Sequence, residues 1–148
     1  MPMAERKATT VWSGALADGS GSLSLNSSSA AKDLPVSWAA RTESPDGKTS
    51  PEELIAAAQA SCYAMAFSNV LSQAGHSPEQ LTVEATCTLD MVDGGPKVTK
   101  VDINVSGKVP GLDQSGFDEL AQQAETGCPI ANSLRGNVEI SVTANLSS

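Results

Sequence analysis

Three cysteines carry the nucleophilic chemistry that this sequence offers: Cys62, Cys87 and Cys128. Their spacings contain no Cys-x-x-Cys pair, and the chain has a single histidine, His76. A zinc site would therefore lack ligands unless two chains shared it, so we expect no metal and no other cofactor. An odd number of cysteines, with no apolar signal segment visible at the N-terminus, favours free thiols in the cytoplasm.

The three cysteines have different surroundings. Cys87 shares one face of an alternating strand pattern with Val83 and Ala85, so we expect it to be a small buried hydrophobe. Cys62 lies in an apolar helix, where a cysteine is more often part of the core than catalytic. Cys128 opens a short helix, where backbone N–H groups and the helix dipole lower the pKa of a thiol. Local chemistry alone therefore favours Cys128 as the more reactive thiol.

Two charged residues could assist a thiol. Arg41 lies among apolar residues just before the turn that leads into the long helix, and its guanidinium could lower the pKa of a thiol or bind an acidic group. An ordinary surface arginine fits this spacing equally well. Glu52 precedes Cys62 by ten residues, which is about 15 Å along one helix. It could join a site with that thiol only through Arg41 or from the helix of a two-fold partner.

The long helix that holds Cys62 is predicted over Ser50–Gly75. A serine at the N-cap, Pro51 at the first helical position and Glu53 in a capping box mark its start. The run Leu54–Leu71 has no charged residue and is apolar on every side. Its length is near the lower limit for a membrane span. Polar residues dilute the run and no basic residues flank it, so we favour a buried helix and expect no membrane partner.

The remaining elements indicate an α+β fold in a single domain, residues 1–148. We expect antiparallel strands packed against helices, and an obligate homodimer, because one chain would struggle to cover a helix that is apolar all round. The predicted elements are strands at about 7–16, 20–28 and 35–42, a hairpin of Leu81–Met91 with a return strand carrying Val101 to Val109, a helix at about 114–126 capped by Asp113, a short turn or helix through Leu134, and a last strand with Val138, Ile140, Val142 and Ala144 inward.

The composition narrows the class of partner. The net charge is −8, from 17 acidic and 9 basic residues, which argues against nucleic acid and anionic membrane surfaces as partners. The chain is 40% hydrophobic but only 3% aromatic, so its core must be built from aliphatic side chains and alanine.

Two cysteine motifs give the sequence a family resemblance. Residues 50–55, Ser-Pro-Glu-Glu-Leu-Ile, lead through Ala60-Ser61-Cys62, and Gly127-Cys128-Pro129-Ile130 follows later in the chain. With this strand order, the chain resembles the OsmC/Ohr family of thiol-dependent peroxidases, in the OsmC (osmotically inducible protein C) branch. The resemblance implies antiparallel sheets wrapped around long central helices in an intertwined homodimer, with two active sites at the subunit interface.

The resemblance also implies residue roles. Cys62 would be the peroxidatic cysteine and Cys128 the resolving one, joined in a disulfide after reaction with an organic hydroperoxide, with hydrogen peroxide as a further candidate substrate. Arg41 matches the arginine that the OsmC branch supplies from the strand before the central helix, whereas the Ohr branch takes it from nearer the N-terminus. Glu52 matches the glutamate that pairs with this arginine. Ala131 replaces a more common serine, which should leave the chemistry intact.

An external thiol or dithiol would complete the cycle, in defence against oxidative or osmotic stress. Two alternatives remain open at this point. One is a non-enzymatic, stress-induced protein that binds an apolar ligand at the dimer interface, with incidental cysteines. The other is a structural Cys62–Cys128 disulfide without turnover.

Overall fold

The computed structural model describes residues 1–147 and has two compact units, Met1–Pro51 and Glu52–Ser148. The N-terminal unit contains a three-stranded antiparallel sheet of order β1-β2-β3. Its strands are β1 (Ala8–Ser13), β2 (Ser20–Leu25) and β3 (Leu34–Val36), and the helix α1 (Trp38–Thr42) follows them. The first two predicted strands are thus confirmed.

The third predicted strand, at residues 35–42, is wrong in its second half. The extended backbone of β3 ends at Val36, and the Ser37 hydroxyl then accepts the N–H of Ala40 at 3.1 Å. Serine is a preferred N-cap, and the alanines that follow it have high helix propensity, so the local signals favour a helix. Arg41 therefore lies in the last turn of a short helix and not on a strand.

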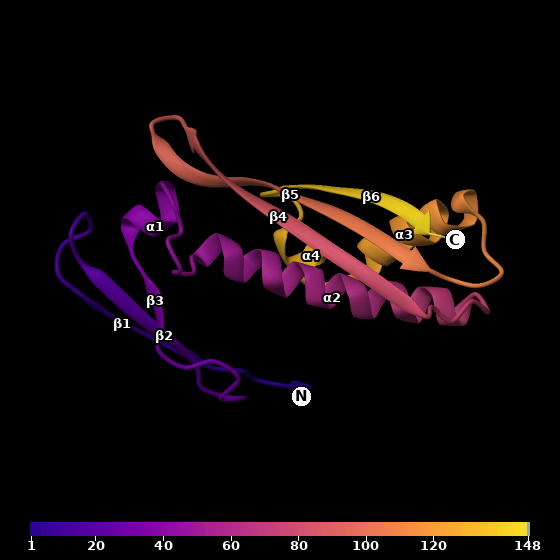
Figure 1. Cartoon of the computed structure of the whole chain (residues 1–148), viewed down its shortest axis with the longest axis horizontal. Helices are drawn as coiled ribbons and strands as arrows, with labels where there is room; N and C mark the ends of the chain where they lie inside the picture. Colours follow the sequence, from indigo (N-terminus) through magenta and orange to yellow (C-terminus); the bar gives the residue numbers. More distant parts are fainter. Residues whose placement is uncertain (148) are drawn as a thin grey trace. The chain divides into compact units, whose positions relative to one another are not determined.

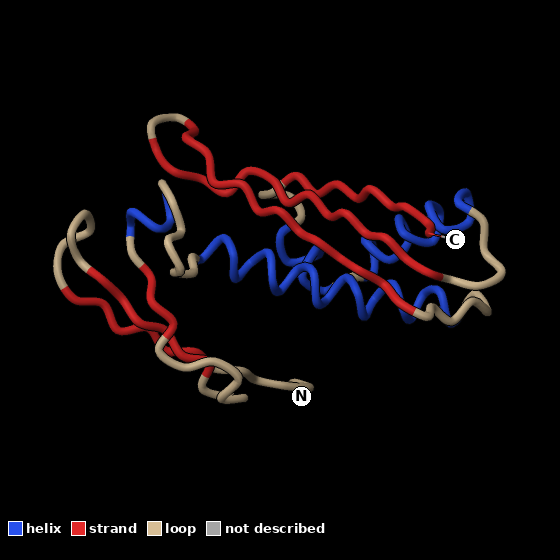
Figure 2. The backbone as a smooth tube through the Cα atoms, viewed as in Figure 1, coloured by secondary structure: helices blue, strands red, loops and turns tan. Residues whose placement is uncertain are grey.

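The C-terminal unit is built on α2 (Pro51–Gln73), which confirms the long helix, and on a second three-stranded sheet of order β4-β5-β6. β4 (Gln80–Val92) and β5 (Gly95–Lys108) form an antiparallel hairpin. Its turn residues, Asp93 and Gly94, both have positive φ, at 50° and 82°, as a two-residue hairpin turn requires. Figure 2 shows the turn of this hairpin extending past the start of β6.

The expectation of antiparallel strands throughout is wrong for one pair. β6 (Glu139–Ser147) runs parallel to β5, with Ile103 opposite Val142. A parallel pair needs a long crossover, and α3 (Gln114–Gly127) and α4 (Pro129–Leu134) provide it. In Figure 1, α2, α3 and α4 all lie on one side of this sheet. Asp113 caps α3 as predicted, because its carboxylate accepts the N–H of Gly116 at 2.8 Å.

The core of this unit lies between the sheet and the helices. Tyr63 and Phe67 of α2 and Phe117 of α3 are completely buried. The ring centroid of Phe67 lies 5.6 Å from that of Tyr63 and 5.0 Å from that of Phe117. Phe117 also lies against Gly107, where an added Cβ would come within 2.8 Å of the ring. Aliphatic residues fill the remainder: Leu71, Val101, Ile103, Val105, Val109, Ala121, Ala124 and Ala131.

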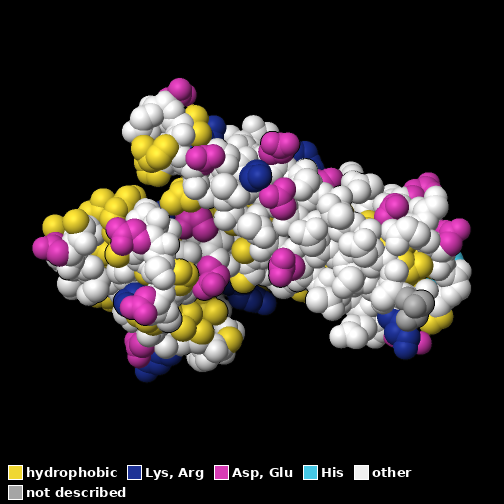
Figure 3. All heavy atoms as spheres, turned by 45° about the horizontal axis from the view of Figure 1, so that its top comes forward, with side chains coloured by type: hydrophobic (Ala, Val, Ile, Leu, Met, Phe, Trp, Pro, Cys, Tyr) yellow, Lys and Arg dark blue, Asp and Glu magenta, His cyan; other side chains and the backbone are white. Residues whose placement is uncertain are grey.

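The helix α2 buries one face completely, and its other positions are half-buried or exposed. Its buried residues recur mostly at intervals of four and are Glu52, Gln59, Tyr63, Phe67 and Leu71. Met65 is 69% exposed. The helix is long and apolar enough to cross a membrane by length and composition, and 22% of its most apolar 18-residue window is buried within the chain. Elsewhere the surface is acidic, with carboxylates scattered over the face in Figure 3.

Candidate functional site

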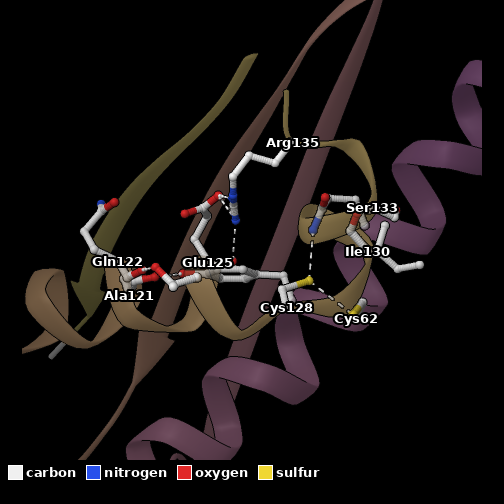
Figure 4. Close-up of polar contacts among 11 residues, drawn as sticks. Cys62, Ala121, Gln122, Glu125, Cys128, Ile130, Ser133 and Arg135 are labelled. Carbon is white, nitrogen blue, oxygen red and sulfur yellow. Dashed lines mark hydrogen bonds and ion pairs between the residues drawn. The ribbon is translucent and has the colours of Figure 1, made fainter. Parts of the chain in front are cut away.

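The fold brings Cys62 and Cys128 together although 66 residues separate them. Cys62 lies in the middle of α2, and Cys128 lies between α3 and α4. Both are free thiols, and the Cys128 S–H donates to the Cys62 sulfur over 3.1 Å, as Figure 4 shows. A disulfide bond is about 2.05 Å long, so a displacement of about 1 Å would allow the sulfurs to bond.

The two thiols differ in their access to solvent. Cys128 is completely buried, whereas Cys62 is half-buried and lines a pocket of about 530 Å³. The pocket walls are mainly apolar, so a small apolar molecule that entered would meet the Cys62 sulfur first. Its other lining residues are Ala58, Ser61, Met65, Ala66, Gly127, Pro129 and Ile130.

The start of α4 acts on a different cysteine from the one that the sequence indicated. Burial raises the pKa of the Cys62 thiol, a backbone hydrogen bond from Ile130 offsets part of this rise, and Cys128 adds to it. We expected the backbone N–H groups at the helix start to act on Cys128. This expectation is wrong for the N–H of Ile130, which acts on Cys62. Cys128 occupies the N-cap position, and its sulfur makes no capping hydrogen bond there. The donor is directed to Cys62, the thiol that faces the pocket.

Sequence reasoning missed Gln59 as a member of the site. This side chain is completely buried, and its Nε2–H donates to the Cys128 sulfur at 3.3 Å. Its Oε1 is buried and has no hydrogen-bond partner within residues 1–147. The available signal was a lone amide three residues before Cys62, on the face of the helix that also carries Tyr63 and Phe67.

Two further contacts hold the segment around Cys128. The Tyr63 hydroxyl donates to the Ala121 carbonyl at 2.8 Å, and burial, with smaller contributions from Cys128 and Glu125, raises the pKa of this phenol. The Arg135 guanidinium lies 2.7 Å from the Glu125 carboxylate and also donates to the Glu125 backbone carbonyl at 3.2 Å. Figure 4 shows this ion pair linking the end of α3 to the end of α4. Cys128 is therefore held from both flanking helices.

The remaining predicted site residues have other surroundings. Arg41 lies in the N-terminal unit with its guanidinium 5.8 Å from the centroid of the Trp38 ring. It lines a 260 Å³ pocket of that unit together with Trp12, Leu16, Val36, Ser37, Trp38 and Pro51. Glu52 is 7% exposed in the first turn of α2. Its charge, after burial, is the second cause that raises the pKa of Cys87.

Cys87 packs against the core from the inward face of β4, as predicted. Within residues 1–147, no three His, Cys, Asp or Glu side chains are grouped so that they could hold a metal ion. The site itself presents two adjacent thiols, one that lines a pocket and one that is completely buried.

Comparison with known proteins agrees with this geometry. A family model described as OsmC-like protein matches residues 44–143. The chain belongs to this family. It is 36% identical over 135 residues to peroxiredoxin OsmC of Escherichia coli (strain K12), an alignment that covers 91% of this chain and 93% of the relative. The resemblance inferred from the two cysteine motifs is thereby confirmed.

More distant relatives carry the other family name and the same fold. The chain is 29% identical over 96 residues to an organic hydroperoxide resistance protein of Xanthomonas axonopodis pv. citri (strain 306), with 64% of this chain and 66% of the relative covered. It is also similar to the crystal structure of the organic hydroperoxide resistance protein OhrB of Bacillus subtilis. That match has a TM-score of 0.74 and 24% identity, and covers 95% of this chain and 98% of the other. The predicted OsmC-like α+β fold is confirmed.

Proposed function

We propose that this protein is a cysteine-based peroxidase that reduces organic hydroperoxides to alcohols in stress defence. The observation that carries the proposal is the Cys62–Cys128 pair, with sulfurs 3.1 Å apart, one lining an apolar pocket and the other completely buried. Relatives named peroxiredoxin OsmC and organic hydroperoxide resistance protein support the same activity.

The difference in access supports the two roles that we propose for the cysteines. The Cys62 thiolate attacks the terminal oxygen of the hydroperoxide, so that an S–O bond forms and the O–O bond breaks. The alkoxide takes up a proton and leaves as the alcohol, which leaves Cys62 as a sulfenic acid. Cys128 then attacks this sulfur: an S–S bond forms, the S–O bond breaks, and the hydroxide leaves with the thiol proton as water. Cys128 stays out of contact with the peroxide because it is buried.

Regeneration requires an external thiol or dithiol. Its thiolate attacks the Cys62 sulfur, which faces the pocket, and Cys128 departs as the leaving thiolate. A second reducing thiol then releases Cys62, and the reductant leaves as its own disulfide. The mainly apolar walls of the pocket suit the alkyl part of an organic hydroperoxide better than they suit hydrogen peroxide.

A positive charge is the further requirement of this mechanism. Burial raises the pKa of Cys62, and the Ile130 hydrogen bond offsets only part of the rise. We propose that Arg41 supplies the charge that stabilises the Cys62 thiolate, and that Glu52 holds Arg41 in place. Arg41→Ala should then move the rate of Cys62 alkylation to higher pH. An unchanged profile would remove Arg41, and Glu52 with it, from the site.

We also propose that the protein is an obligate homodimer in which a second copy covers α2. The apolar helix is only partly covered by its own chain, and Met65, at 69% exposure, borders the Cys62 pocket. Burying this surface against a second copy would stabilise the dimer through the hydrophobic effect. Light scattering at micromolar concentration should give twice the mass of the 15.1 kDa chain. A monomeric mass would contradict the proposal.

Intact mass measurement tests the activity directly. One equivalent of cumene hydroperoxide should remove two hydrogens per chain from the reduced protein, because a disulfide forms between Cys62 and Cys128. A protein that only binds an apolar ligand would keep its mass. A structural disulfide would be revealed before any peroxide is added, since the freshly purified protein would show one free thiol per chain.

A further inference from the structure

Burying the amide of Gln59 lowers the stability of the fold in a way that burying an apolar side chain would not. The side chain is completely buried in the core face of α2, one turn before Tyr63 and two turns before Phe67, which face the same core. A buried amide is destabilising unless its donors and acceptor are bonded, and the Oε1 of Gln59 lacks a partner among the described residues. Leucine or methionine would fill a similar volume without this penalty. The feature that sets the amide apart is its donor, which is directed at the Cys128 sulfur.

Gln59, Cys128 and Cys62 form a short hydrogen-bond series. The Nε2–H of Gln59 donates to the Cys128 sulfur at 3.3 Å, and the Cys128 S–H donates to the Cys62 sulfur at 3.1 Å. Cys128 therefore contacts the Gln59 amide and the Cys62 sulfur at the same time. The contact with the amide holds the Cys128 sulfur in place for attack on Cys62.

We propose that Gln59 is the positioning residue of the resolving cysteine, acting on disulfide formation and on disulfide reduction but not on the reaction with peroxide. The proposal rests on the peroxidase function proposed above. When Cys128 attacks the Cys62 sulfenic acid, the S–S bond forms as the S–O bond breaks, and the thiol proton leaves with the hydroxide as water. Negative charge develops on a sulfur that water does not reach, and the amide N–H is placed to stabilise it.

Negative charge also forms on the Cys128 sulfur when the disulfide is reduced. When an external thiolate attacks the Cys62 sulfur, the S–S bond breaks and the electron pair stays on Cys128. A better-stabilised leaving thiolate departs faster, so the same N–H accelerates this step. Gln59 thus serves both steps in which Cys128 carries charge. The first step, in which only Cys62 touches the peroxide, should not depend on it.

Gln59→Met is the central variant, because it keeps the approximate volume and removes the donor. We expect Cys62 sulfenic acid to form within about twofold of the wild-type rate, while disulfide formation slows roughly tenfold or more, as for a lost hydrogen bond to a charged group. Rapid quenching with dimedone and intact mass would follow both steps, and the slower step should raise the yield of Cys62 sulfinic acid. The matched control is Gln73→Met, at an exposed glutamine of the same helix, which should leave both rates unchanged.

Gln59→Glu separates a positioning role from a structural one. A protonated carboxyl can donate to the Cys128 sulfur and an ionised one cannot. The ratio of the variant's disulfide-forming rate to the wild-type rate should therefore be near one at low pH and fall as pH rises. A loss of packing alone would give a ratio that does not change with pH.

The two proposals fail in different ways. Wild-type protein that forms no disulfide with cumene hydroperoxide would overturn the peroxidase function, and the role of Gln59 with it. Wild-type protein that forms the disulfide, with equal rates and equal sulfinic acid yields in Gln59→Met, would overturn the role of Gln59 alone. If Gln59→Met fails to fold by circular dichroism, the pH trend of Gln59→Glu decides, and a flat ratio overturns the proposal.

Discussion

Cys62 on α2 and Cys87 on β4 are buried to a similar extent but have different neighbours. Both thiols are half-buried, and burial is the main cause that raises the pKa of each. Around Cys62 lie a backbone hydrogen bond from Ile130, a second thiol 3.1 Å away and a pocket. The pKa of Cys87 is raised further by the negative charge of Glu52.

The difference teaches that burial alone does not decide which thiol reacts. A nucleophilic thiol needs a path for its substrate, a group that favours the thiolate, and a partner that captures the oxidised sulfur. The Cys62 region supplies a pocket for the substrate and a second thiol to capture the oxidised sulfur. The Ile130 N–H supplies part of what favours the thiolate. The Cys87 region supplies a carboxylate, which opposes thiolate formation.

The largest expected effect separates the two cysteines by activity. Cys62→Ser should abolish turnover of cumene hydroperoxide, because a serine hydroxyl does not form a nucleophile of comparable strength at neutral pH. Cys87→Ser should stay within about twofold of the wild type, since no step of the mechanism uses that thiol. Peroxide consumption with excess dithiol measures both variants. The assignment is wrong if Cys87→Ser loses activity to the same extent as Cys62→Ser while keeping its thermal unfolding profile.

The second effect concerns Cys128, the neighbouring thiol that Cys62 has. Cys128→Ser should consume one equivalent of hydroperoxide to form the Cys62 sulfenic acid, which has no thiol to condense with, and then lose activity as a second equivalent oxidises it to sulfinic acid. Intact mass should show a gain of two oxygens on Cys62 in the inactivated protein. Sustained turnover by this variant at the wild-type rate, with the added dithiol as the resolving thiol, would show that Cys128 is dispensable.

The third effect tests the backbone donor at the start of α4. Ile130→Pro removes the N–H that acts on Cys62, at a position in the first helical turn where proline is tolerated. The pKa of Cys62 should rise further, so that its alkylation rate at pH 7 falls roughly threefold to tenfold, as for one lost hydrogen bond. Ile130→Val keeps the N–H and serves as the control for side-chain packing. Equal rates in the two variants would show that the donor is unimportant.

The site was predictable from the sequence only in part. Local signals placed Cys62 on a long helix and Cys128 at the start of a short one, and the capping residues fixed both elements within about two residues. The pairing of two thiols separated by 66 residues came from family resemblance, because no local pattern encodes a long-range contact. The backbone N–H groups at the start of the short helix were expected to act on Cys128, whereas the N–H of Ile130 acts on Cys62, since the sequence shows where an N–H lies but not which side chain it faces.

The errors in the fold have the same origin. Residues 35–42 combine β-favouring residues with a Trp-Ala-Ala segment that Ser37 caps. The strand ends at Val36, and the capped segment forms a helix. The parallel pairing of β5 with β6 depends on where α3 and α4 deliver the chain, which strand alternation does not specify. The buried stripe of α2 was hidden because the helix is apolar on all sides. Gln59 stands out only once that stripe is known.

The smallest expected effect lies at Cys87 itself. In a Cys62→Ser, Cys128→Ser background, Cys87 is the single thiol, and its alkylation rate against pH reports its own ionisation. Because the Glu52 charge contributes to its raised pKa, Glu52→Gln should lower that pKa and increase the alkylation rate at pH 8 by roughly twofold to threefold. Glu53→Gln, which changes the neighbouring exposed carboxylate, is the matched control. A profile that does not respond to Glu52→Gln would mean that burial alone sets the low reactivity of Cys87. The contrast with Cys62 would then rest on the pocket, the Ile130 donor and the second thiol.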